Sequence, residues 1–182
     1  MDIKDHILAA WRIGLDHFIP LVILTLVLSA VSILSIGILA PVAFAGYTSS
    51  LLLLMKQNRE PKAQDVFSQL RLFFPLLIFT LVILLISAIG FTLIVIPGIV
   101  FAIIVGYTCL YMMPLMVDRQ FGLIDAVKKS TAIVTTRPVA DHVVVFLIFY
   151  VLTTIGGSSF IGFLVLQPFA TLFLLSVYQQ TH

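Results

Sequence analysis

The sequence predicts an all-α integral membrane protein with six transmembrane helices arranged as three hairpins. Hydrophobic residues make up 61% of its 182 residues and charged residues only 10%, whereas soluble globular domains carry about 25% charged residues. The mean hydropathy is +1.20. A net charge of +2 argues against a nucleic-acid partner, because such proteins present clustered basic surfaces.

The N-terminal segment is predicted to be an amphipathic helix. Its apolar residues recur every three or four positions, at Ile3, Ile7, Trp11, Leu15 and Phe18. This spacing marks one face of a helix, and Arg12 lies on the opposite face. A helix with Trp and Phe beside a charged face suits the membrane interface. The alternative is a helix of soluble type that packs on a partner.

Six apolar runs account for the predicted transmembrane helices. They cover residues 20–35, 41–55, 75–89, 97–117, 142–155 and 160–178. The core of a bilayer needs about 20 such residues, and the shorter runs fit a thin or locally adapted bilayer. Gln167-Pro168 is expected to interrupt the sixth run. The predicted structural turns are Gly37, Gly90, Pro97 with Gly98, and Gly156.

The distribution of charge predicts the orientation. All ten Lys and Arg residues lie in the N-terminal segment or in the loops 56–71 and 118–141. The opposite loops, near Gly37, Gly90 and Gly156, contain no Lys, Arg, Asp or Glu. Positive charge stays on the cytoplasmic side of a membrane. We therefore expect a multi-pass protein of a prokaryotic cytoplasmic (inner) membrane with both termini in the cytoplasm.

The chain reads as one transmembrane domain, 1–182, in which one plan recurs. Each proposed unit (1–56, 57–117 and 118–182) contains an amphipathic segment, a proline, an apolar run, an Ile-Gly turn and a second apolar run. Units with the same orientation would be related by an axis along the membrane normal. The alternative is that Pro and Gly mark helix ends in any membrane protein.

The stretch from about Val95 to Thr135 resembles poorly characterised prokaryotic multi-pass proteins, namely the YciC-like proteins and the membrane domain of some glycerophosphoryl diester phosphodiesterases. The matching positions are Ile96-Pro97-Gly98, Pro114, Val117-Asp118, Gly122, and Ala126 with Ser130. The resemblance implies a six-helix membrane domain. It brings no catalytic residues, because the phosphodiesterase chemistry belongs to a separate soluble domain that this sequence does not include.

Catalytic, cofactor and metal sites are not predicted. Cys109 stands alone, and no serine elbow accompanies a His/Asp pair. His142, at the start of the fifth run, is the best haem or quinone candidate, but an interfacial histidine satisfied by water or headgroups explains it more simply. None of the six runs contains Asp, Glu, Lys or Arg, which argues against an ion-coupled transporter.

Two groups of residues are candidates for contacts. The first group would bind lipid headgroups or a partner at the interface: Trp11, Arg12, Arg119, Asp125, Lys128, Lys129 and Arg137. Each cation near an anionic surface contributes about 1 kcal/mol, although the same charges also serve simply to fix topology. The second group, Tyr47, Tyr107 and Gln167, would line a cavity between the repeats; packing, or the end of a short helix at Gln167, is the alternative.

Two functions follow as hypotheses. The first is a non-catalytic scaffold or accessory subunit of a membrane complex, in contact with lipids and with other membrane subunits or copies of itself. The second is a carrier or channel for a lipid or a small apolar solute. An intramembrane enzyme is a third and weaker interpretation. A continuous polar cavity would favour transport, whereas a tightly packed interior with a flat apolar flank would favour the scaffold.

Overall fold

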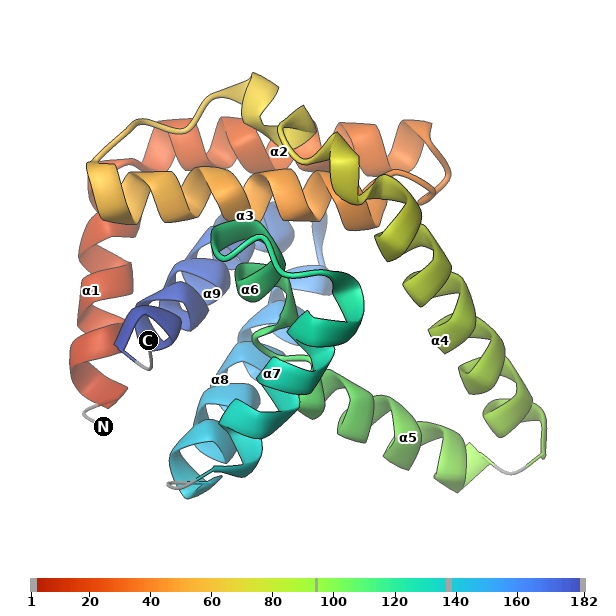
Figure 1. The fold of residues 1–182 in the computed structure, drawn as a ribbon. Helices are drawn as coiled ribbons and strands as arrows, with labels where there is room; N and C mark the ends of the chain where they lie inside the picture. Colours follow the sequence, from red (N-terminus) through yellow and green to blue (C-terminus); the bar gives the residue numbers. More distant parts are fainter. Residues whose placement is uncertain (1–2, 94, 137–138, 181–182) are drawn as a thin grey trace.

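The computed structural model describes residues 3–93, 95–136 and 139–180, without the side chains of residues 91–97. Every element in these ranges is helical (Figure 1). The elements are α1 (Ile3–Asp16), α2 (Phe18–Leu34), α3 (Ala40–Gln57), the 3-10 turns η1 (Ala63–Phe67) and η2 (Leu70–Leu72), α4 (Phe73–Leu93), α5 (Val95–Thr108), α6 (Met112–Asp118), α7 (Leu123–Thr135), α8 (Val139–Gly157) and α9 (Phe160–Gln180). The predicted all-α class is confirmed.

Within the described ranges, four helical stretches are long and apolar enough to cross a membrane: Ala63–Gly90, Gly98–Asp118, Val139–Gly157 and Phe160–Gln180. The number of candidate spans becomes five if the bent pair of α1 and α2 is counted as one span. The six predicted spans are therefore not confirmed. By itself α2 has only 17 residues, and α3 is less apolar because it carries Tyr47 to Ser50 and ends in Lys56-Gln57.

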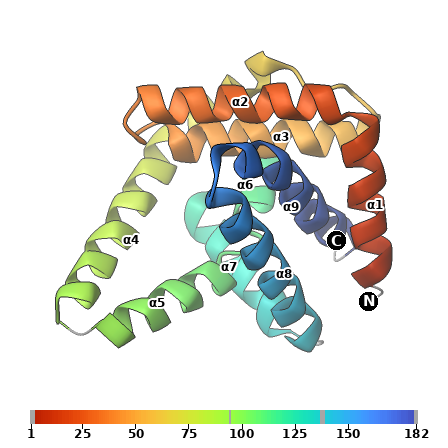
Figure 2. The same ribbon diagram turned by 180° about the vertical axis from the view of Figure 1, so that it is seen from behind.

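Helix α1 turns sharply away from α2, with 89° between their axes, and lies beside α9 (Figures 1 and 2). Its buried residues are His6, Ala10 and Gly14. A Cβ atom on Gly14 would come within 2.2 Å of the Phe169 ring, so the two helices pack closely there. The predicted apolar face is not the packed face, and Trp11 is 53% exposed.

Helices α2 and α3 form an antiparallel pair, side by side in both views (Figures 1 and 2). The turn between them contains Gly37, whose φ of +82° is accessible to glycine without steric cost. After α3 the chain folds back, and η1 packs on α3 at Gly46. A Cβ atom there would lie 2.2 Å from the carbonyl oxygen of Val66, so only glycine allows this approach.

Helices α4 and α5 form an open V that extends from the rest of the molecule (Figure 1). The predicted turn at Gly90 is not observed there, because α4 continues to Leu93. Gly90 instead allows close packing: a Cβ atom at this position would lie 3.1 Å from the Cα of Gly98. Pro97 lies in the first turn of α5, a position at which its missing N–H is tolerated.

The fourth apolar run is not one helix. α5 ends at Thr108 and α6 begins at Met112, with turn residues between them. The Ser130 hydroxyl of α7 donates to the Thr108 carbonyl at 2.7 Å and accepts from the Tyr111 N–H at 3.1 Å. A side chain from another helix therefore satisfies backbone groups that the break exposes.

Helix α9 lies at the centre of the molecule and packs against α8, α1, α2 and α3. In its most apolar stretch 56% of the residues are buried, compared with 11% for the stretch that contains α4. The predicted interruption at Gln167-Pro168 is wrong, because α9 is continuous with Pro168 inside it. Gly156, in the last turn of α8, lies against α9: a Cβ atom there would be 3.1 Å from Cβ of Leu166.

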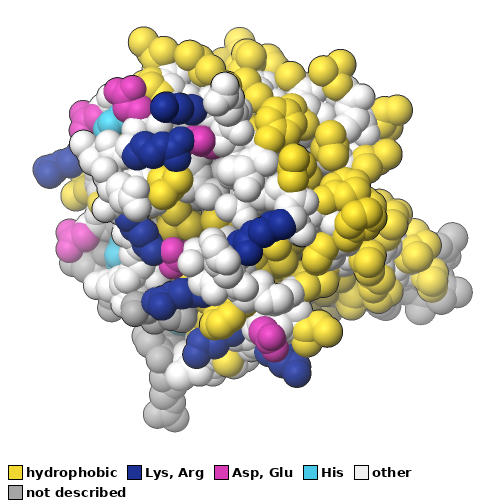
Figure 3. Space-filling model, turned by 45° about the horizontal axis from the view of Figure 1, so that its top comes forward, with side chains coloured by type: hydrophobic (Ala, Val, Ile, Leu, Met, Phe, Trp, Pro, Cys, Tyr) yellow, Lys and Arg dark blue, Asp and Glu magenta, His cyan; other side chains and the backbone are white. Residues whose placement is uncertain are grey.

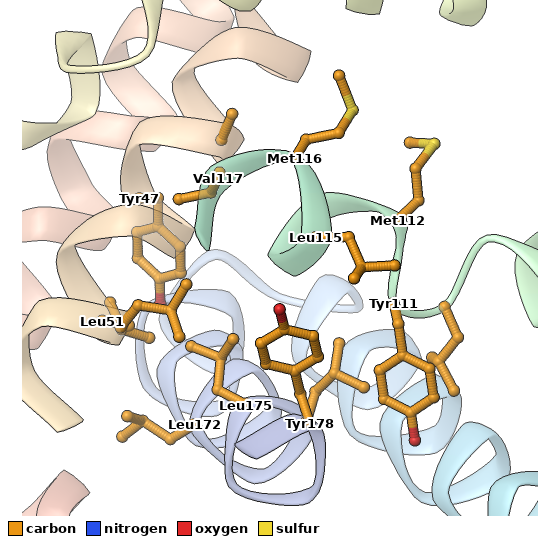
Figure 4. Packing of buried hydrophobic residues seen from close by; sticks show 14 of the residues in the cluster. Tyr47, Leu51, Tyr111, Met112, Leu115, Met116, Val117, Leu172, Leu175 and Tyr178 are labelled. Carbon is orange, nitrogen blue, oxygen red and sulfur yellow. The ribbon is translucent and has the colours of Figure 1, made fainter. Parts of the chain in front are cut away.

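The buried core gathers where α3, α6 and α9 meet (Figure 4). Tyr47, Tyr111 and Tyr178 are among its largest fully buried side chains. Figure 4 shows their rings among side chains of the same cluster, including Leu51, Leu115, Leu172 and Leu175. The core is therefore formed mainly by α3, α6 and α9, and α4 contributes little to it.

Candidate functional site

A cavity of about 360 Å³ lies between α3, α4, α5, α6, α8 and α9. This volume falls in the range of about 300–1,000 Å³ that is typical of small-molecule sites. Its wall is mainly aromatic and aliphatic, with Phe44, Phe79 and Phe149 among its side chains, and Met112 and Met113 contribute flexible thioethers. Methionine adapts to ligands of irregular shape.

The polar groups of the wall are few, and most of their hydrogen atoms are already used. Thr48, Thr153 and Thr171 each donate to the backbone carbonyl four residues earlier in the helix, at 2.8, 2.9 and 2.9 Å. The thiol of Cys109 also lies in the wall and is only a weak donor. The hydroxyls of the three threonines are therefore used within their own helices.

A second hollow of about 560 Å³ lies between the arms of the V formed by α4 and α5. It shares Phe79 and Val105 with the central cavity. Its wall includes Leu84, which is 60% exposed on α4. The two hollows are thus contiguous, and the outer one reaches the surface of the molecule.

The three predicted cavity residues do not line either hollow. Tyr47 is fully buried and its hydroxyl lies 3.4 Å from that of Thr25, and the Tyr107 hydroxyl donates to the Val134 carbonyl of α7 at 2.8 Å. Gln167 is buried and donates to Thr171 at 3.4 Å. Residues one or four positions away (Thr48, Gly106 and Thr171) line the cavity instead.

Asp118 connects three helix ends on the charged side of the molecule. Its carboxylate accepts from Lys56 Nζ at the end of α3 and from the Tyr178 hydroxyl of α9, the latter at 3.2 Å. Arg119 lies 3.7 Å from the same carboxylate. Figure 3 shows one face of the molecule, with charged side chains gathered over one part of it and hydrophobic side chains over the other.

Asp65, in η1, is the centre of a second group of polar contacts on this side. Its carboxylate accepts from Ser50 at 2.7 Å, from Arg59 at 2.6 Å and from the Lys62 N–H at 3.0 Å. Burial raises the pKa of this carboxyl, but these hydrogen bonds and the nearby guanidinium outweigh burial, so the net pKa lies below its ordinary value. Asp65 therefore fixes η1 against α3 in its ionised form.

Two histidine contacts join elements that are far apart in sequence. His6 lies 2.6 Å from the Ser176 hydroxyl and 2.7 Å from the Gln180 side-chain oxygen. These two contacts join the first turn of α1 to the C-terminal end of α9. His142, the haem or quinone candidate, is buried and contacts the Tyr111 hydroxyl at 3.1 Å. No cluster of three potential metal ligands occurs in the part of the chain that the structure describes.

The predicted interfacial residues lie mostly on the outside. Trp11 stacks on Phe169 with ring centroids 5.0 Å apart, and Arg12 beside it is exposed. Asp125, Lys128 and Lys129 line a shallow groove on α7 with Phe121 and Ala132. Arg137 lies outside the described residues. Among the residues that the structure describes, Lys128 and Lys129 offer their charge to an open groove rather than to an enclosed site.

Searches for related proteins return no match among protein-family models, curated proteins or solved structures.

Proposed function

We propose that the chain is a multi-pass protein of a prokaryotic cytoplasmic membrane, with six spans in three hairpins and both termini in the cytoplasm. The charge distribution supports this orientation. The 89° bend between α1 and α2 suits a helix that lies in the interface before a spanning helix. The exposed apolar face of α1, with Trp11 and Leu15, would then contact lipid. The threefold repeat and the relation to YciC-like proteins belong to this proposal.

Within this membrane protein we propose a non-catalytic role, as a scaffold or accessory subunit of a membrane complex. The exposure of α4 carries the proposal. An apolar stripe runs along this helix at intervals of three and four residues and consists of Phe74, Ile78, Leu81, Leu85 and Ile89, each at least half exposed. α4 packs mainly on α5 and, less extensively, on α3, so its outer face is free for a transmembrane helix of another subunit.

Native mass spectrometry of the protein, extracted gently from its own membrane, tests this proposal. We expect a second polypeptide at a fixed ratio. The double substitution Leu81→Ala with Leu85→Ala should remove that polypeptide. The matched control is Leu147→Ala with Val151→Ala, which truncates two similarly exposed residues at the same spacing on α8. A lone protomer or a homo-oligomer would contradict the accessory-subunit role.

A second candidate function is a carrier for a lipid or small apolar solute. The central cavity is lined mainly by apolar side chains, so it is not the continuous polar cavity expected of a transporter, but it has room for an apolar molecule. Gln167 positions Thr171 in the cavity wall, so Gln167→Leu should abolish transfer of the solute. Transfer of fluorescent lipid between leaflets of proteoliposomes measures this activity. Unchanged transfer in the Gln167→Leu protein would count against a carrier that depends on this wall.

A further inference from the structure

We propose that the central cavity holds one hydrocarbon chain of a membrane lipid, which enters sideways between α4 and α5. The inference deepens the carrier candidate and rests on the same cavity, but it requires only binding and no transport. A lipid that remains bound would equally suit an accessory subunit. The site consists of the central cavity together with the hollow between α4 and α5.

The chemistry of the wall selects the occupant. A polar solute that leaves water needs hydrogen-bonding partners in its site. The hydroxyls of Thr48, Thr153 and Thr171 all donate to backbone carbonyls of their own helices, so they have no hydrogen atom left for a ligand. Tyr150 also lines the cavity and is 54% exposed, so its hydroxyl is the polar group that a ligand could still meet. A dry apolar cavity of about 150 Å³ already takes up apolar molecules, and this cavity is more than twice that volume, at about 360 Å³.

The residues that the two hollows share indicate where a lipid chain would enter. Phe79 of α4 and Val105 of α5 border both hollows. The outer hollow lies between the arms of the V, and its wall on α4 extends from Phe79 to Ala88, two residues before the contact of Gly90 with Gly98. The exposed stripe on α4 indicates that lipid or a partner helix surrounds this part of the molecule. An acyl chain that enters between Phe79 and Val105 would therefore reach the central cavity at Cys109 and Met112 without crossing a charged surface.

Photo-crosslinking with a phospholipid tests the site. The protein is reconstituted in vesicles of phosphatidylethanolamine and phosphatidylglycerol that contain a small fraction of phosphatidylethanolamine with a diazirine in the middle of one acyl chain. After irradiation, peptide mass spectrometry locates the adducts. We expect adducts on the cavity wall, at Cys109, Met112 and Phe149, in addition to adducts on the lipid-facing residue Leu85 of α4.

Two neighbouring residues of α5 provide a matched pair of variants. Val105→Trp adds bulk where the two hollows meet, whereas Ile104→Trp adds the same bulk at a residue that is 55% exposed and lines neither hollow. Val105→Trp should reduce the wall adducts at least fivefold and leave those on Leu85 unchanged. Ile104→Trp should change neither. The Leu85 adducts also report whether each variant is correctly inserted.

The outcomes separate this inference from the proposed functions. Adducts on Leu85 without adducts on the wall would overturn the inference even if Val105→Trp fails to fold, because the unmodified protein alone gives that result. Equal wall adducts in the two variants would also overturn it. Wall adducts that respond to Val105→Trp, in a protein without lipid transfer, would support the site and reject only the carrier. Detection of a second polypeptide, without adducts on the cavity wall, would support the scaffold function and overturn the proposed lipid site.

Discussion

The Ser130 hydroxyl lies 2.7 Å from the Thr108 carbonyl oxygen, to which it donates a hydrogen bond across the break between α5 and α6. The same hydroxyl accepts from the Tyr111 N–H. Since Ser130 is fully buried, no water can replace it. We expect Ser130→Ala to lower the free energy of unfolding by about 1–3 kcal/mol, the cost of buried polar groups left without partners. Unfolding in mixed detergent micelles measures this loss.

Thr135→Ala is the control for this prediction. The Thr135 hydroxyl is exposed and donates only within α7, to Thr131, so its removal should change the free energy of unfolding by less than about 0.5 kcal/mol. Equal losses in the two variants would show that the junction does not depend on Ser130.

Gly46 should be harder to replace than Gly157. A Cβ atom on Gly46 would lie 2.2 Å from the Val66 carbonyl oxygen and 2.5 Å from that of Asp65, and backbone atoms cannot rotate away as a side chain can. We expect Gly46→Ala to cost about 1–3 kcal/mol, as overpacking usually does. Gly157→Ala, where a Cβ atom meets nothing within 4 Å, should be neutral or slightly stabilising. Thermal unfolding of the two variants in the same detergent compares them.

Because of the ionised carboxylate of Asp65, the protein should become less stable in acid. Its pKa is lower in the folded protein than its ordinary value, so its contribution is fully present above that ordinary value, about 3.9. The contribution is lost as the pH falls through the lower, folded-state pKa. Asp65→Asn should therefore be less stable than the native protein at pH 7, and the difference should shrink below about pH 4.

Unfolding at pH 7 and at pH 3 tests the assignment. Glu60→Gln, at an exposed position in the loop before η1, should leave the pH dependence of stability unchanged. A difference between Asp65→Asn and the native protein that stays constant from pH 7 to pH 3 would contradict the role given to the ionised carboxylate.

The helical class and most helix positions are predictable from the sequence, because apolar length and the residues at helix ends act locally. The break after Thr108 is not, since neither Pro nor Gly occurs between Thr108 and Met112 and the partner, Ser130, lies on another helix. The sequence also fails to predict that α9 continues through Pro168. Proline within a buried apolar helix is tolerated because neighbouring groups compensate for its missing N–H.

The rotation of each helix about its axis is the main source of error at the candidate site. One residue turns a helix by about 100°, and a helix that is apolar on all sides gives no pattern to fix its orientation. The sequence therefore indicates the Gly-Tyr-Thr segments but not that Thr48 and Gly106, rather than Tyr47 and Tyr107, line the cavity. On α1 the reason is different: the sequence does mark an apolar face, but the packed face consists of His6, Ala10 and Gly14, and small and polar residues do not mark a core.

The proposed six-span topology predicts which loops lie outside the cell. In a Cys109→Ala background, cysteines at Ile36 and Ser158 should react with a membrane-impermeant maleimide in intact cells. Cysteines at Glu60 and Lys128 should react only after the membrane is permeabilised. All four positions are exposed, so burial does not explain a difference. If Ile36 and Glu60 react from the same side, α3 does not cross the bilayer. If both react only after the membrane is permeabilised, the α2–α3 pair with its Gly37 turn fits one face of a protein with four spans.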